Sequence, residues 1–266
     1  MITLSRPFLL LAGLATFLSQ SSTVLSGARG SWDNVPAIQK LLDGVTPTTG
    51  KITLELPGVT QDGSAVSLSV RVDHPLSGAD ALKEIHVFAD GNPSPELLSL
   101  RVSPLLGEAR FSTRIRLERS QNVIALARTA DDQWLVGEQA VRVTVSGCLT
   151  RGQANDEGPD FMQTRVRPPA PLRRGQTGEI RTLITHPMET GLRTNRGGQP
   201  IPERIIHTFT AELEGETVVE ATLHRAISMN PFLLFPIAPE SSGELNMQWI
   251  DTSGRTATAQ TPVVVR

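Results

Sequence analysis

Apolar and polar residues alternate along much of the chain from residue 51 onwards. Ile52, Leu54 and Leu56 alternate with polar neighbours, and the same period recurs over residues 66–72, 111–117 and 141–145. A period of two residues is typical of a strand that buries one face. Turn-forming pairs such as Pro57-Gly58 and Asp62-Gly63 separate these runs. The first half of the chain is therefore predicted to consist of half-buried strands.

The same pattern resumes after residue 164. Residues 205–213 and 217–223 flank Glu214-Gly215-Glu216, which predicts a β-hairpin. Alternation at residues 245–250 and a final apolar run that ends at Arg266 predict two more strands. Because short strands recur without alternating helices, we expect an all-β fold with one β-sandwich in each half.

One short helical segment and one polar segment interrupt the predicted strands. Residues 35–42 have a helical pattern, and Asn34 is expected to be the N-cap. Residues 149–160 carry almost no apolar side chains, which indicates a linker. We therefore expect a first domain over residues 31–148, a linker over 149–163 and a second domain over 164–266.

The first residues have the order of a secretory signal. Arg6 precedes an apolar run from Pro7 to Leu18, and small residues follow it. The run is too short to span a hydrocarbon core of about 30 Å comfortably. We expect a signal peptide over residues 1–28, cleaved between 22 and 30, with an uncleaved anchor as the alternative. In both cases the protein is exported.

Composition limits the function classes. The chain of 266 residues is 39% hydrophobic and 20% charged, with a net charge of −2. This balance argues against nucleic-acid binding, which needs a concentrated basic face. The single Cys rules out an intrachain disulfide and a metal site with several Cys ligands. With no Tyr and three Trp, an aromatic platform for sugars or bases is not expected.

Cys148 is the sharpest candidate for chemistry. It follows a predicted strand through Ser146 and Gly147, and it lies at the start of the polar linker. Gly147 carries no side chain to restrain the backbone, so the thiol would sit on a pliable stem. An exposed thiol in this position suits covalent carriage or redox exchange. The alternative is a small buried hydrophobe, which is the commoner role of a free Cys.

Two other groups of residues deserve comparison with this thiol. The segment His186-Pro187-Met188-Glu189-Thr190-Gly191 contains two soft-metal ligands, His and Met, but a copper site needs more, so a turn with a packed Met is favoured. A basic stretch with Arg193, Arg196 and Arg204 could attract an anion, although a solvated loop is the favoured interpretation. We expect no metal and no cofactor, and no hydrolytic set of residues can be assembled.

A family resemblance rests on motifs in both halves. The second half, with the run 178–191, Ile201-Pro202, Asn230-Pro231 and Trp249 to Asp251, resembles SoxZ. The first half resembles SoxY through Ile52, Leu54, Pro57, Gly63, Val66, the stretch Asp90 to Pro93 and the strand that leads into Gly147-Cys148. Together they cover nearly all of the mature chain. Such a fusion is similar to SoxYZ-like carriers associated with quinoprotein dehydrogenases.

The resemblance implies two immunoglobulin-like β-sandwich domains and a periplasmic sulfur carrier with no turnover of its own. In that family the SoxY arm, Gly-Gly-Cys-Gly-Gly, holds sulfur intermediates on its Cys. Gly147 and Cys148 match the arm, whereas Ser146, Leu149 and Thr150 replace its other glycines. The expected partners are periplasmic enzymes of sulfur-compound (thiosulfate) oxidation or a quinoprotein dehydrogenase, without nucleic acid and without membrane contact after signal cleavage. A non-catalytic module that docks on a quinoprotein dehydrogenase is the alternative, and an enzyme is the least favoured.

Overall fold

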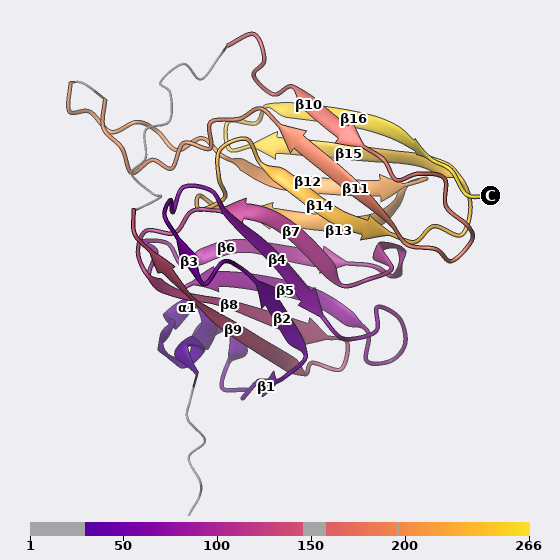
Figure 1. Ribbon diagram of the computed structural model, residues 1–266, viewed down its shortest axis with the longest axis horizontal. Helices are drawn as coiled ribbons and strands as arrows, with labels where there is room; N and C mark the ends of the chain where they lie inside the picture. Colours follow the sequence, from indigo (N-terminus) through magenta and orange to yellow (C-terminus); the bar gives the residue numbers. More distant parts are fainter. Residues whose placement is uncertain (1–29, 146–157, 196) are drawn as a thin grey trace, which may run out of the picture.

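The alternating segments form the strands of two sheets that pack face to face (Figure 1). The structure is a computed structural model that describes residues 30–145, 158–195 and 197–266. The helical elements are η1 (Ser31–Asn34), α1 (Pro36–Leu42) and η2 (Pro104–Leu106). In chain order the strands are β1 (Thr48–Thr49), β2 (Ile52–Glu55), β3 (Val59–Thr60), β4 (Val66–Val72), β5 (Leu82–Ala89), β6 (Glu96–Val102), β7 (Arg110–Ile115), β8 (Gln121–Thr129), β9 (Trp134–Val143), β10 (Thr164–Arg167), β11 (Gly178–Ile184), β12 (Ile206–Leu213), β13 (Glu216–Leu223), β14 (Phe232–Ile237), β15 (Gly243–Asp251) and β16 (Thr256–Val263).

Both sheets run without a break from the first half of the chain into the second. The ten-stranded sheet has the order β1-β9-β8-β5-β6-β13-β12-β15-β16, and β3 pairs with β9. The six-stranded sheet has the order β10-β11-β14-β7-β4-β2. The halves meet where β6 pairs with β13 in one layer and β7 pairs with β14 in the other. The predicted all-β architecture is confirmed, and the two sandwiches share backbone hydrogen bonds in both layers.

The core lies between the sheets and is shared by the two halves. Its aromatic rings form a chain across the junction: Phe111 stacks on Phe235 at 6.5 Å, and Phe209 lies 5.8 Å from Phe235 and 5.0 Å from Trp249. A smaller apolar cluster lies under α1, where Ile38 packs on the outer face of the ten-stranded sheet. The junction is therefore an apolar interior rather than a polar contact between separate domains.

Local predictions fare well where the pattern is regular. The hairpin at Glu214-Gly215 is confirmed, and both residues have positive φ, 49° and 83°, as a tight turn between twisted strands requires. The helix is confirmed as α1, but the predicted cap is wrong: Asn34 belongs to η1, Val35 is the N-cap, and no side chain caps the helix. In the part of the chain that the structure describes, no helix is long and apolar enough to cross a membrane.

Candidate functional site

The structure describes the chain segments on either side of Cys148, the predicted carrier thiol. Cys148 and Gly147 lie outside the described residues, as do residues 1–28 of the predicted signal peptide and residues 149–157 of the predicted linker. The described chain stops at Val145 and starts again at Gly158. The geometry of the site is therefore the geometry of the surfaces that hold these two ends.

The first flank is the end of β9. The carbonyl of Val145 accepts a hydrogen bond from the backbone N–H of Gly63 at 2.8 Å. The hydroxyl of Thr144 donates to the carbonyls of Thr60 and Gln61 at 3.3 and 3.2 Å. The side chain of Val145 is 55% exposed. The backbone is thus held as far as Val145, three residues before Cys148, while the side chain faces solvent.

The junction of the two halves lies beside this flank. The hydroxyl of Ser228 donates to the carbonyl of Ser64, next to Gly63, at 2.9 Å. Arg116 is only 9% exposed, and its guanidinium donates to the carbonyls of Met188 at 2.7 Å and Pro187 at 3.3 Å. An arginine of the first half therefore clamps the His186-Pro187-Met188 segment of the second half.

The second flank is anchored by an aromatic ring. The ring of Phe161 lies 5.4 Å from that of His186, under the guanidinium of Arg204 at 4.4 Å and beside that of Arg255 at 5.2 Å. Contacts of this kind between arginine and an aromatic face are attractive. The backbone N–H of Met162 donates to the carbonyl of Thr185 at 2.9 Å. The chain that returns from residues 146–157 is thus fixed on the second half.

His186 is a buried, neutral histidine. Its Nδ1 accepts a hydrogen bond from the backbone N–H of Met188 at 3.1 Å, so the ring proton is on Nε2. Nε2 lies 3.7 Å from Oδ2 of Asp251, and neither side chain is exposed. Burial lowers the pKa of His186 to about 4, with Arg204 acting in the same direction and Asp251 in the opposite one.

Asp251 is held in its charged form by donors. Burial raises its pKa, but the hydroxyl and backbone N–H of Ser253 and the backbone N–H of Arg255 all donate to Oδ1. These bonds outweigh burial, so the pKa of Asp251 lies below its usual value. The pair is a neutral imidazole facing a carboxylate, so only one of these two buried groups is charged.

The favoured interpretation of the His–Met segment agrees with the structure. Met188 is fully buried, and its sulfur accepts a hydrogen bond from the backbone N–H of Ile206 at 3.2 Å. No cluster of metal-binding side chains occurs among the described residues. The segment is thus a packed turn at the junction.

The basic stretch is engaged inside the second half. Arg193 forms an ion pair with the carboxylate of Glu189, and Nε of Arg204 lies 3.9 Å from Oδ2 of Asp251. Arg196 lies outside the described residues. Arg193 and Arg204 therefore hold the loop in place, which differs from the solvated loop expected from the sequence.

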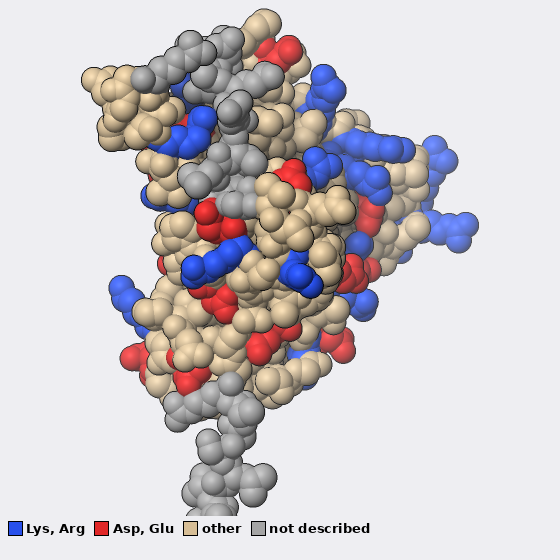
Figure 2. All heavy atoms as spheres, turned by 60° about the vertical axis from the view of Figure 1, so that its left-hand side comes forward, with Lys and Arg blue, Asp and Glu red and all other residues tan. Residues whose placement is uncertain are grey.

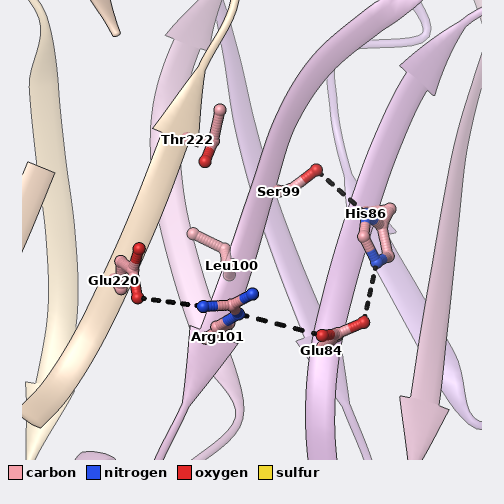
Figure 3. A pocket seen from close by; sticks show the side chains of 7 residues that line it. All are labelled: Glu84, His86, Ser99, Leu100, Arg101, Glu220 and Thr222. Atoms are coloured by element: carbon pink, nitrogen blue, oxygen red, sulfur yellow. Dashed lines mark hydrogen bonds and ion pairs between the residues drawn. The ribbon is translucent and has the colours of Figure 1, made fainter. Parts of the chain in front are cut away.

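A polar group on the outer face of the ten-stranded sheet resembles a hydrolytic set at first sight (Figure 3). Nδ1 of His86 lies 2.9 Å from the hydroxyl of Ser99, and Nε2 lies 3.4 Å from Oε2 of Glu84. Burial lowers the pKa of His86, and the hydrogen bond with Glu84 opposes this. However, β5 and β6 are paired along the segments that carry these residues, so their amides bond across the strands. These paired strands therefore offer no free backbone N–H group that could stabilise an oxyanion.

Family comparisons assign both halves. Residues 38–148 match the family described as sulfur oxidation protein SoxY, and residues 166–262 match the family described as sulphur oxidation protein SoxZ. The chain joins a SoxY domain to a SoxZ domain. This tandem indicates a carrier-type function in sulfur oxidation. No curated protein matches the chain.

Two solved structures resemble part of this SoxY–SoxZ chain. The sulfur carrier protein SoxY from Chlorobium limicola f thiosulfatophilum is 21% identical, with a TM-score of 0.35 over 41% of this chain and 94% of that one. A superoxide reductase (neelaredoxin) from Ignicoccus hospitalis is 17% identical, with a TM-score of 0.32 over 35% of this chain and 80% of that one.

Sequence reasoning missed Arg116 and Phe161. Both act through groups that carry no sequence signal, namely backbone carbonyls and a ring face. Arg116 lies between Ile115 and Leu117, and nothing in this local pattern distinguishes it from a solvent-facing strand residue.

Proposed function

We propose that the protein is a periplasmic carrier that holds a sulfur intermediate covalently on Cys148 while partner enzymes load, oxidise and release it. The observation that carries the proposal is the SoxY match, which ends at residue 148 and is followed by SoxZ in the same chain. In this scheme the chain has no turnover of its own. Thiosulfate is the proposed source of the sulfur.

The chemistry asked of Cys148 is that of a thiolate. A free thiol has a pKa of about 8.5, so a few per cent is ionised at neutral pH. Joining the thiolate to the outer sulfur of thiosulfate forms one S–S bond and releases two electrons. A partner oxidoreductase accepts these electrons. The carrier supplies only the nucleophile and its presentation.

The described flanks support this role. Before the loop, the N–H of Gly63 donates to the carbonyl of Val145, and the hydroxyl of Thr144 donates to the carbonyl of Thr60. After the loop, the ring of Phe161 is held by arginine side chains. A loop fixed at both ends keeps its thiol at one end of the sandwich. Partner enzymes would therefore meet the carried group at a defined place.

The test is the intact mass of protein purified from its native host. We expect an increment at Cys148 that a reductant removes and that corresponds to sulfur atoms or an oxidised sulfur group. Replacement of Cys148 by Ser should abolish the role in the host, since a hydroxyl gives almost no anion at neutral pH. Full complementation by C148S would refute carriage.

One observation favours a second candidate, a module that docks on a quinoprotein dehydrogenase. Ser146, Leu149 and Thr150 stand where the resemblance implies glycines, and the chain continues beyond them. Under this alternative C148S complements fully, while surface substitutions impair function.

Export is a further part of the proposal. The signal-peptide pattern in residues 1–28 supports periplasmic delivery. The N-terminal sequence of the mature protein from a periplasmic fraction tests it, and a start between residues 23 and 31 is expected. A cytoplasmic protein that retains Met1 would refute export.

A further inference from the structure

The outer face of the six-stranded sheet concentrates arginines from both halves. Directly paired residues of neighbouring strands project on the same face. The pairs Arg167–Arg181 and Arg71–Arg110 therefore each place two guanidinium groups side by side. The basic face is defined as the outward arginines of β4, β7, β10 and β11, which are Arg71, Arg110, Arg114, Arg165, Arg167 and Arg181.

Carboxylates neutralise this face only in part. Glu179 is shared by Arg110 at 2.9 Å and Arg181 at 3.1 Å, and Arg110 also lies 3.6 Å from Glu108, so two carboxylates serve these two guanidinium groups. Arg114 lies over the ring of Phe232 at 5.5 Å. Figure 2 shows Lys and Arg gathered at the upper right, on the second half. The face is positive although the chain as a whole has a net charge of −2.

An open groove crosses the middle of the basic face. Its volume is about 650 Å³, and its lining combines apolar groups with hydroxyls, one guanidinium and one carboxylate at its edge, among them Pro57, Ser67, Ser69, Arg114, Phe232 and Glu55. The groove adjoins the stem of the carrier loop, because Pro57 precedes Gly58, whose carbonyl accepts a hydrogen bond from the backbone N–H of Arg142 in β9. A molecule bound here would lie next to the strand that leads to Cys148.

We propose that the basic face is the docking surface for a partner protein with an acidic surface, namely the enzyme that acts on the group at Cys148. This inference rests on the proposed carrier function. Arginine and aromatic side chains around an apolar centre are the composition typical of protein interfaces, and the half-buried Phe232, Leu183 and Leu234 supply that centre. Opposite charge on the partner would speed and orient encounter.

A second copy of the chain fits this face poorly in a two-fold arrangement. A symmetric contact would place the basic face of one copy against the basic face of the other, and like charges across an interface are costly. The groove and the basic face also belong to both halves, since Arg165 comes from the SoxZ domain and Arg71 from the SoxY domain. A partner that reads the whole face therefore recognises the paired domains rather than either one alone.

The experiment uses poly-L-glutamate as an acidic polypeptide probe, with binding followed by fluorescence anisotropy of the labelled probe. The test variant is R165E/R167E. The matched control is K40E/K83E, which changes net charge equally at two exposed side chains on α1 and β5. We expect the test variant to bind about tenfold more weakly or worse, the control to change less than about twofold, and salt to weaken binding.

Several results would overturn the docking surface. Equal weakening by the control would show a general charge effect. Stronger binding to vesicles of anionic phospholipid, lost in R165E/R167E, would assign the face to a membrane. Self-association of the wild type that R165E/R167E abolishes in sedimentation would assign it to a second copy. Far-UV circular dichroism establishes that both variants are folded.

The same samples separate this inference from the carrier proposal. C148S should bind poly-L-glutamate as the wild type does, because the probe contacts the basic face and not the thiol. If C148S complements fully in the host while R165E/R167E still loses probe binding, carriage fails; the basic face then remains a surface for an acidic partner, but that partner is not an enzyme that acts on Cys148. If C148S abolishes function while R165E/R167E binds normally, only the surface fails.

Discussion

Replacing Arg116 by Ala should destabilise the whole sandwich. The guanidinium is buried and donates to the carbonyl of Met188 at 2.7 Å, with longer bonds to Pro187 at 3.3 Å and Arg225 at 3.4 Å. A hydrogen bond from a charged group contributes about 1.5–3 kcal/mol, and its removal leaves a buried carbonyl unpaired. Counting one strong and two weak bonds, we expect a loss of about 3 kcal/mol in the free energy of unfolding.

Urea unfolding followed by tryptophan fluorescence measures this loss. Trp134 reports on the first half and Trp249 on the second, and the shared sheets should make the fluorescence and circular dichroism transitions coincide. R116K keeps the positive charge but lacks the planar guanidinium with its several donors, so its free energy of unfolding should fall by about half as much. The control R101A removes an arginine whose side chain is 71% exposed, and should change stability by less than about 0.5 kcal/mol. A loss for R116A no larger than that of R101A would refute the clamp.

Three further predictions follow from the described contacts. Proteolysis within residues 149–157 should give two fragments that stay together on a sizing column, because β6–β13 and β7–β14 pairing remains; fragments that separate would contradict the shared sandwich. Because the pKa of His186 is lowered to about 4, the folded state binds fewer protons than the unfolded state between pH 6.5 and 4. The free energy of unfolding should therefore fall as the pH drops from about 6.5 to 4, and it should fall less steeply in H186N. Parallel pH profiles for the two proteins would show that this histidine is not the cause. Cys148 should react with a thiol reagent in the native protein within minutes and form a disulfide-linked dimer on oxidation, whereas reaction only after denaturation would indicate a buried thiol.

The strands that were predicted well are those with one buried face and one solvent-exposed face. β4 alternates between buried and exposed or half-buried residues along its whole length, and the alternation is visible in the sequence. β8 was not predicted, because its centre is buried on both sides, by the core and by the cluster under α1. A strand covered on both faces has a continuous apolar run, which carries no period of two.

The continuity of the sheets could not be predicted from local pattern. The partner of β6 is β13, which is distant in sequence, and the choice depends on which edges the two sandwiches bring together. The alternation in each strand specifies its buried face but not its neighbour. The same limit applies to the site: sequence identified Cys148 as a candidate, whereas the surfaces that hold its flanks depend on contacts such as that of Arg116 with Met188.

Attachment at both ends restricts the reach of the loop that holds the proposed carrier thiol. Cys148 is three residues beyond Val145, whose carbonyl is bonded to Gly63, so its backbone can lie at most about 11 Å from that of Val145. A thiol on so short a stem cannot search for partners over a large volume. If Cys148 carries sulfur as proposed, the partner has to bring its active site to this end of the sandwich, and recognition by the surrounding surface then matters more than the length of the arm. A docking face that adjoins β9 meets this requirement, since it would place a bound enzyme beside the stem before any contact with the thiol.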